Sequence, residues 1–561
     1  MKRLFKYISF VFLIAIIATL SSCFFERTND NDKVLTEKKV QFTSLAEDYT
    51  VNDTEVNLYF YENGNVPLIE VTAYYNMLTG YYDNSQRDVS INTLFNRLYI
   101  ASTSNSAIRT IFDWKYNTVT FKNTLSVYPQ KSNESTDFSS YYDLKLAKGI
   151  TSLELEYYLE DYGVDILYYN DKVLMPLGFL NFMNSDYYNV VYNGTKLYGF
   201  YYDDDMTDVY NTDLNGKEIP DDLVLATKNE LLFLLNEKYG LKEYNNVTDY
   251  GRTISSDIMN KISSKNAETR VDGFVEIVNG LLDDPHSRMM TSSFYSTNKD
   301  NLNGAKYHTS KERYVNISAT FRELRGYFSE SEKYNQPIYY KNDTLFITFD
   351  GFEVGKKEEV YQSEGVYKED AYLKDTAALF YKALNDCKDN HPEVKNVVID
   401  VSINGGGYIA AMYRALTFLS DNDIYFGYQV GKDAVEVYNL IGDPNMDGNN
   451  DNDSFGQYNY YILESGGTFS AANAFTCFAK YSGIAKTIGK RSGGGMCAVM
   501  PYILSDGTQF TLSDSTQQVA IRASHDKFYV YEIESGAPVD IALEYKDFYN
   551  LDKIIELIHA N

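Results

Sequence analysis

The chain has 561 residues, more than one ordinary hydrophobic core accommodates, so two to four domains are expected. A hydrophobic content of 44%, a charged content of 23% and 53 tyrosines are typical of a folded protein and argue against intrinsic disorder. The net charge of −27 argues against nucleic acids and anionic lipid surfaces as partners, since both bind concentrated Lys and Arg.

Residues 1–23 have the pattern of a bacterial export signal. A basic start, 1–6, precedes an apolar stretch, 7–20, that is short for a membrane-spanning helix. The stretch ends in Leu-Ser-Ser-Cys23, which resembles the lipobox of bacterial lipoproteins and implies that Cys23 becomes the acylated first residue. The alternative is an ordinary signal peptide with an incidental cysteine. We expect a lipid-anchored protein at the bacterial cell surface or on the periplasmic side of the membrane.

The other three cysteines, Cys387, Cys477 and Cys497, are odd in number and widely spaced. This pattern fits neither a disulfide framework nor a zinc site. We expect three buried free thiols.

The N-terminal third of the chain is expected to be β-rich. Residues 24–39 are polar and predict a flexible tether, and residues 40–202 contain strand-like runs separated by Asn-Gly and Asp-Asn turns. Two stretches within it, 65–78 and 172–183, each contain Pro-Leu followed by a short apolar helical pattern. They predict a duplicated module and resemble the N-terminal-like domains of copper amine oxidases. No catalytic motif is present there, so a binding or packing role is expected.

The middle of the chain is expected to be helical. An acidic, turn-rich segment, 203–216, predicts a linker, and residues 217–290 have apolar residues at helical spacing. This pattern ends in Asp284-Pro-His286. We expect a helical subdomain that carries His286 at its end, where one interpretation is a turn histidine that caps the preceding helix.

From residue 343 to the end, strand and helix patterns alternate. Such alternation predicts an α/β domain with parallel strand pairs. The expected strands are 345–349, 397–401, 460–463 and 498–504, and the expected helices are 371–385, 410–419 and 471–481.

Ser470 lies at the most informative turn of the sequence. The expected strand 460–463 leads into a Gly-Gly turn, and a helical pattern begins at Ala471. A serine at a strand-to-helix turn has an exposed hydroxyl beside the free N–H groups of the helix, which can stabilise an oxyanion. The alternative is a plain helix N-cap, for which serine is a favoured residue.

A second glycine-rich turn, Gly405–Gly407, follows the expected strand 397–401. Glycine lets backbone approach a substrate closely, so the N–H groups of Gly406 and Ala471 are the expected oxyanion hole. A nucleotide-binding loop is disfavoured, because Tyr408 stands where a phosphate-binding loop has lysine.

Taken together and in this order, the three motifs resemble the S41 serine peptidases, the family of tricorn core proteases and C-terminal processing proteases. In that family a helical segment ends in Asp-x-His, a strand leads into Asp-x-Arg-x-Asn-x-Gly-Gly, and Ser-x-x-Glu opens a helix. The matching segments here are 284–286, 400–407 and 470–473, within a resemblance that covers roughly 221–543. It implies an S41-type α/β (ClpP/crotonase-like) catalytic domain over 343–561. We expect no PDZ module, because the stretch available for one is close to the lower size limit of a domain.

The resemblance implies that Ser470 attacks a peptide carbonyl. One branch of the family supplies the base as a lysine in a Gly-Lys-Gly turn; Gly495 holds that position here, so His286, in the tricorn-like position, is the expected base. A further Glu of the tricorn-like network corresponds to Glu534 or Glu532, of which we take Glu534, because the register of this segment differs by one from the family's and fits neither residue exclusively; an exposed acidic strand is the alternative. No cofactor and no catalytic metal are implied, and the expected partner is a peptide or protein substrate.

Two departures from the family pattern leave a second function open. Ser402 stands where the family has Arg, and Asn473 stands where it usually has Glu. Neither change removes the nucleophile or the base, but both alter the surroundings of the site. The alternative is therefore a catalytically inactive surface lipoprotein that binds peptide or polysaccharide.

An acidic loop, 443–454, has oxygen side chains and a glycine, Gly448, in the pattern of an EF-hand-like or dockerin-like calcium loop. Ser454 replaces the bidentate Glu at the end of that pattern. Because Asn, Asp and Gly are also turn residues, a solvated acidic turn is the preferred interpretation, with weak calcium binding at most.

Overall fold

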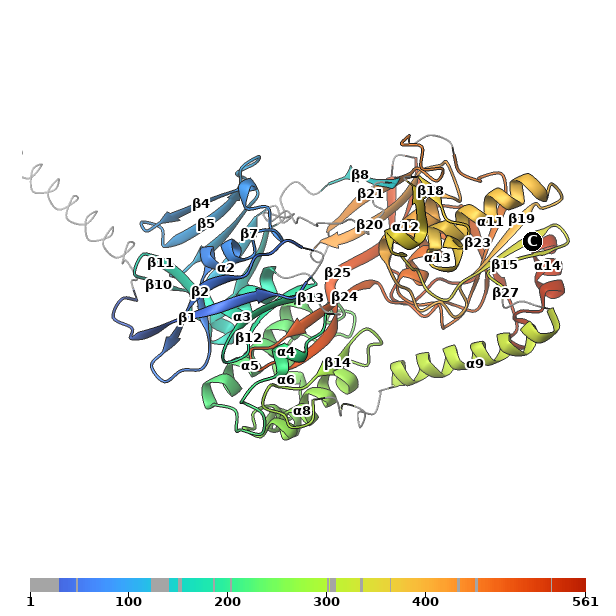
Figure 1. The fold of residues 1–561 in the computed structure, drawn as a ribbon. Helices are drawn as coiled ribbons and strands as arrows, with labels where there is room; N and C mark the ends of the chain where they lie inside the picture. The colour runs from blue at the N-terminus through green and yellow to red at the C-terminus, as the bar shows by residue number, and fades with distance from the viewer. Residues whose placement is uncertain are drawn as a thin grey trace, which may run out of the picture.

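The computed structural model is a mixed α/β protein with two lobes (Figure 1). It describes residues 30–46, 49–122, 141–149, 154–184, 187–201, 204–299, 302, 309–332, 336–363, 365–430, 434–449, 453–525 and 527–561. The predicted export signal and Cys23 lie outside these residues. Over the ranges described, none of the helices has both the length and the apolar character needed to cross a bilayer.

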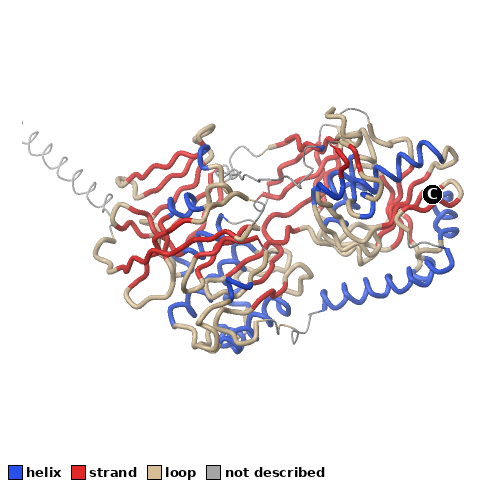
Figure 2. Tube along the Cα trace, in the orientation of Figure 1, coloured by secondary structure: helices blue, strands red, loops and turns tan. Residues whose placement is uncertain are grey.

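The N-terminal lobe is built on a seven-stranded sheet of order β10-β11-β3-β2-β1-β13-β12. Its strands dominate the left side of Figure 2. Strand β1 starts within the predicted tether, so residues 35–39 belong to the sheet and the tether is shorter than expected. The bounds are β1 (Leu35–Ser44), β2 (Thr54–Tyr61), β3 (Leu68–Glu70), β10 (Leu167–Tyr169), β11 (Lys172–Pro176), β12 (Tyr188–Tyr192) and β13 (Leu197–Tyr201).

The two similar Pro-Leu stretches form equivalent strand–helix units. Strand β3 continues into helix α2 (Val71–Met77), and strand β11 continues into helix α3 (Leu177–Asn184). The two strands pair with each other antiparallel, with Leu68 opposite Pro176. The predicted repeat thus supplies two adjacent strands of the sheet, β11 and β3, next to the edge strand β10.

A second, five-stranded antiparallel sheet of order β4-β5-β6-β7-β9 completes the lobe. Apolar residues on alternate positions, such as Leu98 and Ile100, are buried, as expected for a sheet with one face on the core. Its strands are β4 (Arg87–Asn92), β5 (Arg97–Ser102), β6 (Arg109–Asp113), β7 (Thr118–Lys122) and β9 (Glu154–Tyr158).

The predicted helical subdomain lies beneath this lobe in Figure 1. Each of its two main helices is extended by a π-helical turn, and a short strand, β14 (Arg288–Thr291), follows immediately after His286. The elements are α5 (Asp221–Phe233), η4 (Leu234–Lys238), α6 (Tyr250–Thr253), α7 (Ser256–Ile262), α8 (Ala267–Val275) and η5 (Glu276–Leu281).

The second lobe contains the expected α/β layers. Its sheet has the order β15-β16-β19-β22-β23-β27, with β16 to β27 parallel and β15 antiparallel at the edge. The strands are β15 (Ile338–Lys341), β16 (Thr344–Thr348), β19 (Asn396–Asp400), β22 (Asn459–Glu464), β23 (Ala485–Gly489) and β27 (Ile541–Ala542). Strands 345–349, 397–401 and 460–463 are therefore confirmed within a residue or two.

Helices cover both faces of this sheet, as the alternation of its side chains requires. Val397 and Ile399 of β19 pack into the main core, and Val398 between them packs into a second cluster on the other face. On the first face lie α11 (Thr376–Asn390), α12 (Ile409–Thr417) and α13 (Ala471–Tyr481); α9 (Thr309–Glu332) and α14 (Leu551–Ala560) contribute to the second cluster. The predicted helix 471–481 has the bounds of α13, whereas the predicted helix 371–385 starts later, at Thr376.

A further sheet joins the two lobes. Its order is β14-β25-β20-β21-β8, and β24 and β26 also pair with β25. The expected strand 498–504 is β24, but it pairs antiparallel with β25 and does not extend the parallel layer. The bounds are β8 (Tyr142–Lys148), β20 (Ile424–Val430), β21 (Ala434–Gly442), β24 (Cys497–Ile503), β25 (Gln509–Ser524) and β26 (Lys527–Tyr531). Because β8 comes from the N-terminal region and β14 from the helical subdomain, the predicted domains share this sheet.

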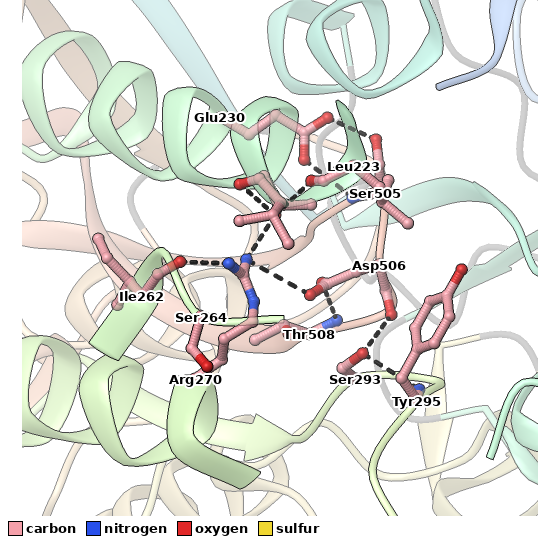
Figure 3. A network of polar contacts seen from close by, with 12 residues as sticks. Leu223, Glu230, Ile262, Ser264, Arg270, Ser293, Tyr295, Ser505, Asp506 and Thr508 are labelled. Carbon is pink, nitrogen blue, oxygen red and sulfur yellow. Dashed lines mark hydrogen bonds and ion pairs between the residues drawn. The ribbon is translucent and has the colours of Figure 1, made fainter. Parts of the chain in front are cut away.

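The tip of the β24–β25 hairpin is held inside the helical subdomain by a buried polar network (Figure 3). The Glu230 carboxylate on α5 accepts hydrogen bonds from the backbone N–H and hydroxyl of Ser505. Next to it, Asp506 forms an ion pair with Arg270 of α8, 3.7 Å apart, and both side chains are at most 1% exposed. The network fixes the hairpin to the subdomain that carries His286.

Glu230 makes the stability of this junction depend on pH. Burial raises the pKa of Glu230 to about 7, opposed by the hydrogen bonds from Ser505. The folded protein therefore holds this proton at pH values where the unfolded chain has lost it, so stability falls as pH rises from about 4.5 to about 7. We expect the free energy of unfolding to decrease between pH 5 and pH 8 by roughly 1–3 kcal/mol less in Glu230→Gln than in the wild type, as measured by denaturant unfolding at the two pH values. An unchanged pH dependence in the variant would contradict this assignment.

Candidate active site

Ser470 lies in a strained backbone conformation at the start of α13. Its φ of 56° and ψ of −125° are unusual for a residue other than glycine, and its side chain makes no capping hydrogen bond to the helix. The plain N-cap interpretation is therefore wrong, because a capping serine has an extended backbone and accepts an N–H of the first turn. The geometry is that of a sharp strand-to-helix elbow, a turn at which a serine can present its hydroxyl for reaction; the role of Ser470 as nucleophile stays a prediction.

Two backbone hydrogen bonds hold this elbow. The N–H of Ser470 donates to the carbonyl of Gly494 at 2.9 Å, and the N–H of Phe469 donates to the carbonyl of Asn404 at 3.0 Å. The nucleophile turn is thereby fixed between the two glycine-rich turns that the sequence singled out. This local strain is maintained by surrounding contacts, as expected for a functional turn.

The glycine-rich turn after β19 borders Ser470, as predicted. A Cβ placed on Gly406 would lie 2.8 Å from the Ser470 Cβ and 3.0 Å from the Ala471 nitrogen. The N–H of Gly406, however, donates to the Asn404 side chain at 2.9 Å. Gly406 could serve as an oxyanion donor only if it shares or releases that hydrogen bond, so its role stays a prediction, as does that of Ala471, the first residue of α13.

His286 is brought to the same region, 184 positions before the serine in sequence. Its ring packs on Phe469, the residue before Ser470, with 4.7 Å between the ring centroids. Its Nδ1 lies 3.3 Å from the Ser513 hydroxyl of β25, and its carbonyl accepts the Thr511 hydroxyl at 2.7 Å. Strand pairing between β14 and β25 thus positions the histidine.

The Asp284 carboxylate shapes the turn that carries His286. It accepts the backbone N–H of His286 at 3.0 Å and the Ser287 hydroxyl at 2.6 Å, and it is only 2% exposed. The Nδ1 atom of His286 is engaged with the Ser513 hydroxyl. His286 and Ser470 are neighbours through Phe469, and the hydrogen bond between their side chains stays a prediction.

Of the two candidate glutamates, Glu534 faces the site. Its carboxylate accepts the N–H of Met496 at 2.7 Å, beside the turn whose Gly494 carbonyl holds Ser470. Glu532 is exposed and instead accepts the N–H groups of its own turn, at Glu534 and Ser535. The preference for Glu534 thus has a geometric basis, while its catalytic role stays a prediction.

The environment of Glu534 favours its protonated form near neutral pH. Burial raises the pKa of Glu534 to about 8, the carboxylates of Asp284 and Glu532 add to the shift, and N–H donation from Met496 opposes it. Below that pH the Glu534 carboxyl group is mostly neutral, so it acts as a hydrogen-bonding side chain and not as a negative charge that would stabilise a nearby cation.

The two departures from the family pattern have well-defined structural roles. Ser402 is fully buried, and its hydroxyl lies 2.6 Å from the Tyr549 hydroxyl. Asn473, also fully buried, donates to the Ile533 carbonyl at 2.9 Å and accepts from the Ser492 hydroxyl at 2.7 Å. Asn473 thus ties α13 to the segment that leads to Glu534.

Three contributors to the site carried no recognisable sequence motif. Phe469 contacts His286, Ser513 contacts the imidazole, and Tyr314 of α9 packs on Phe469 with 5.1 Å between ring centroids. Each depends on a contact between segments far apart in sequence. For Tyr314 alone, the helical spacing of Tyr314, Ile317 and Phe321 could have indicated from the sequence that this helix packs on the domain.

The remaining sequence expectations concern cysteines and the acidic loop. The three cysteines are buried free thiols, as predicted. Oxygen atoms of Asp443, Asp447 and Asp453 lie within 4.8 Å of one another, and the Asp443 carboxylate accepts the N–H groups of Asp447 and Gly448. These are the bonds of an acidic turn, and weak calcium binding stays a prediction.

Comparison with known proteins supports the motif analysis. The model of peptidase family S41 matches residues 356–524, a stretch that includes the glycine-rich turn and Ser470. No curated protein matches the sequence.

Solved structures that the chain matches in part include the photosystem II D1 C-terminal processing protease, at 17% identity over 36% of this chain and 42% of that one, with a TM-score of 0.25. A candidate peptidase from Parabacteroides merdae is 16% identical over 60% of this chain and 96% of its own, with a TM-score of 0.42. A lipoprotein from Streptococcus agalactiae is 13% identical over 60% and 98%, with a TM-score of 0.34. The chain thus spans less than half of the first of these proteins.

Residues 356–524, the part of the chain that matches peptidase family S41, carry the strand, the glycine-rich turn and the serine elbow in the family's order.

Proposed function

We propose that the protein is a serine peptidase that hydrolyses peptide bonds in extended polypeptides, with Ser470 as nucleophile and His286 as base. The observation that carries the proposal is the strained elbow at Ser470, whose hydroxyl is not used as a helix cap. A strained turn of this kind costs folding free energy, on the order of 1–3 kcal/mol, and such strain is found mainly at functional sites.

In the first half of the proposed reaction, Ser470 Oγ bonds to the substrate carbonyl carbon while its proton passes to the imidazole of His286. The imidazole then protonates the amine as the carbon–nitrogen bond breaks, which leaves an acyl-enzyme. In the second half, water attacks the ester, gives its proton to His286, and the proton returns to Ser470. Each step conserves protons, and no cofactor enters.

Ser513 has a supporting role in this proposal. Its hydroxyl oxygen lies 3.3 Å from Nδ1 of His286, where it can accept a hydrogen bond from a protonated Nδ1 and leave Nε2 as the basic atom. The hydroxyl thus takes the orienting position that a carboxylate has in many triads. A weaker acceptor stabilises the imidazolium less, so a modest turnover rate is expected.

The N–H of Ala471, at the N-terminus of α13, is the proposed main oxyanion donor. The helix dipole adds a favourable field at that end of the 11-residue helix. The turn at Gly406 borders the same space and would contribute once its N–H is shared with the substrate oxygen.

The proposal is tested by incubating the purified protein with denatured casein and identifying the products by mass spectrometry. We expect new peptides with free carboxyl termini, absent with the Ser470→Ala variant. If the wild-type protein is well folded and leaves casein intact, the peptidase assignment is wrong.

The second candidate is a binding lipoprotein without catalysis. It is favoured by one observation, a cavity of about 830 Å³ between the N-terminal sheet and α5, lined in part by Tyr61, Tyr162 and Phe179. Aromatic side chains of this kind suit peptide or polysaccharide ligands. Retention of a peptide without its cleavage would favour this function.

We also propose that Cys23 carries the lipid that anchors the protein on the outer side of the cell membrane, from the Leu-Ser-Ser-Cys23 pattern. Intact mass of the membrane-extracted protein is expected to show a chain that begins at acylated Cys23. A chain that begins elsewhere and lacks lipid would rule the anchor out.

A further inference from the structure

Helix α9 presents one continuous stripe to the α/β domain. The stripe comprises Tyr314, Ile317, Ser318, Phe321 and Arg325, a spacing of three and four residues that places them on one helix face. Phe321 and Ser318 are buried, whereas Val315 on the opposite face is 53% exposed. The helix therefore packs along the domain as part of its structure.

The N-terminal half of this stripe lies against the nucleophile turn. A Cβ placed on Gly466 would lie 3.1 Å from Ile317, and one on Gly467 would lie 3.2 Å from the Ser318 hydroxyl. Both glycines belong to the loop that ends at Ser470. The α9 face thus forms one side of that loop.

Tyr314 reaches furthest toward the reacting groups. Its hydroxyl would lie 2.7 Å from a Cβ on Gly405, and its ring packs on Phe469, which in turn packs on His286. The phenol therefore fills space between the glycine-rich turn and the residue before the nucleophile. A substrate bound at Ser470 must pass through or beside this space.

The C-terminal half of the stripe anchors the helix. Arg325 donates to both carboxylate oxygens of Asp350, at 2.6 and 2.5 Å, and lies 3.7 Å from the carboxylate of Asp400, which is fully buried at the end of β19. Phe321 packs on Phe548 with 4.6 Å between ring centroids. An ion pair that is only partly exposed and a buried aromatic contact together hold Tyr314 in position.

We propose that Tyr314 is a substrate-contacting residue that sets the size selectivity of the site, admitting small side chains next to the scissile bond and excluding bulky ones. This role rests on the proposed peptidase function. Its basis is steric: the phenol already contacts Gly405 and Phe469, so a large substrate side chain placed there would meet it.

The test compares Tyr314→Ala, Tyr314→Phe and wild type on a peptide series. The peptides have the sequence around a bond cleaved in casein and differ only by Ala, Leu or Phe at the positions beside that bond. We expect Tyr314→Ala to lower the Ala-to-Phe ratio of kcat/KM by about 10-fold or more, and Tyr314→Phe to keep the wild-type ratio. Val315→Ala, on the exposed face of the same helix, is the matched control and should behave as wild type.

An Ala-to-Phe ratio that is unchanged in Tyr314→Ala overturns the proposal. If the rates are also unchanged, the residue has no role in selecting substrates; an equal loss on every peptide shows a purely structural role, and an equal gain shows that Tyr314 only obstructs the site. Should Tyr314→Ala fail to fold, Tyr314→Leu, which keeps an apolar contact with less bulk, gives the same comparison. If the wild-type protein cleaves none of the peptides, the proposed peptidase function is wrong, and the role of Tyr314 falls with it.

Discussion

His286→Ala is expected to lower kcat/KM for peptide hydrolysis by about 10⁴-fold or more, and Ser470→Ala by a similar factor. The serine hydroxyl is too weakly acidic to attack without a base, and the position of the alternative lysine base is occupied by Gly495. Because the two residues act as one unit, the double variant should be little worse than either single variant.

Steady-state kinetics of the three variants on one peptide gives this comparison. His525→Ala, at an exposed histidine beside Ser524, is the control and should retain full activity. A fully active His286→Ala variant would show that another group takes the proton. Effects that multiply in the double variant would show that Ser470 and His286 work independently.

Gly406→Ala is expected to abolish activity while the protein remains folded. The added Cβ would lie 2.8 Å from the Ser470 Cβ and 3.0 Å from the carbonyl oxygen of Phe469, closer than real Cβ contacts allow. Position 406 also has a φ of 106°, which side-chain-bearing residues rarely adopt, so about 1 kcal/mol or more of stability should be lost as well. The backbone shift that relieves the clash moves the nucleophile and the expected oxyanion donor together.

The control for the backbone strain is Gly483→Ala. Gly483 has a φ of 77°, but a Cβ there meets no atom within 4 Å. The two variants should lose comparable stability in thermal unfolding, whereas only Gly406→Ala should lose activity per folded molecule. Equal activity in both would show that the glycine-rich turn does not shape the site.

Much of the α/β domain follows from local patterns. The buried strands around Val397 and Ile462 and the helix that begins at Ala471 have continuous apolar or helical periodicity, and the structure has them where the sequence predicts. The elbow itself was detectable because Gly-Gly-Thr-Phe-Ser separates a strand from a helix. What argued against the N-cap interpretation was the backbone conformation of Ser470, which the sequence does not report.

The features that the sequence did not predict depend on contacts between segments far apart in the chain. The 16-residue strand β25 pairs with strands from the helical subdomain and from both sides of the acidic loop, and its mixed composition has no strict alternation. Ser513 comes to lie beside His286 only through that pairing. Likewise, the hydrogen bond from Gly406 to Asn404 and the turn that engages Glu532 depend on local geometry that residue types alone leave open.

The central claim, that Ser470 is an activated nucleophile, is tested most directly by reacting the folded protein with a fluorophosphonate probe and locating the label by peptide mass mapping. We expect one adduct, on Ser470, lost in Ser470→Ala and strongly slowed in His286→Ala. An unlabelled, well-folded protein, or a label on another serine such as Ser513, would contradict the account.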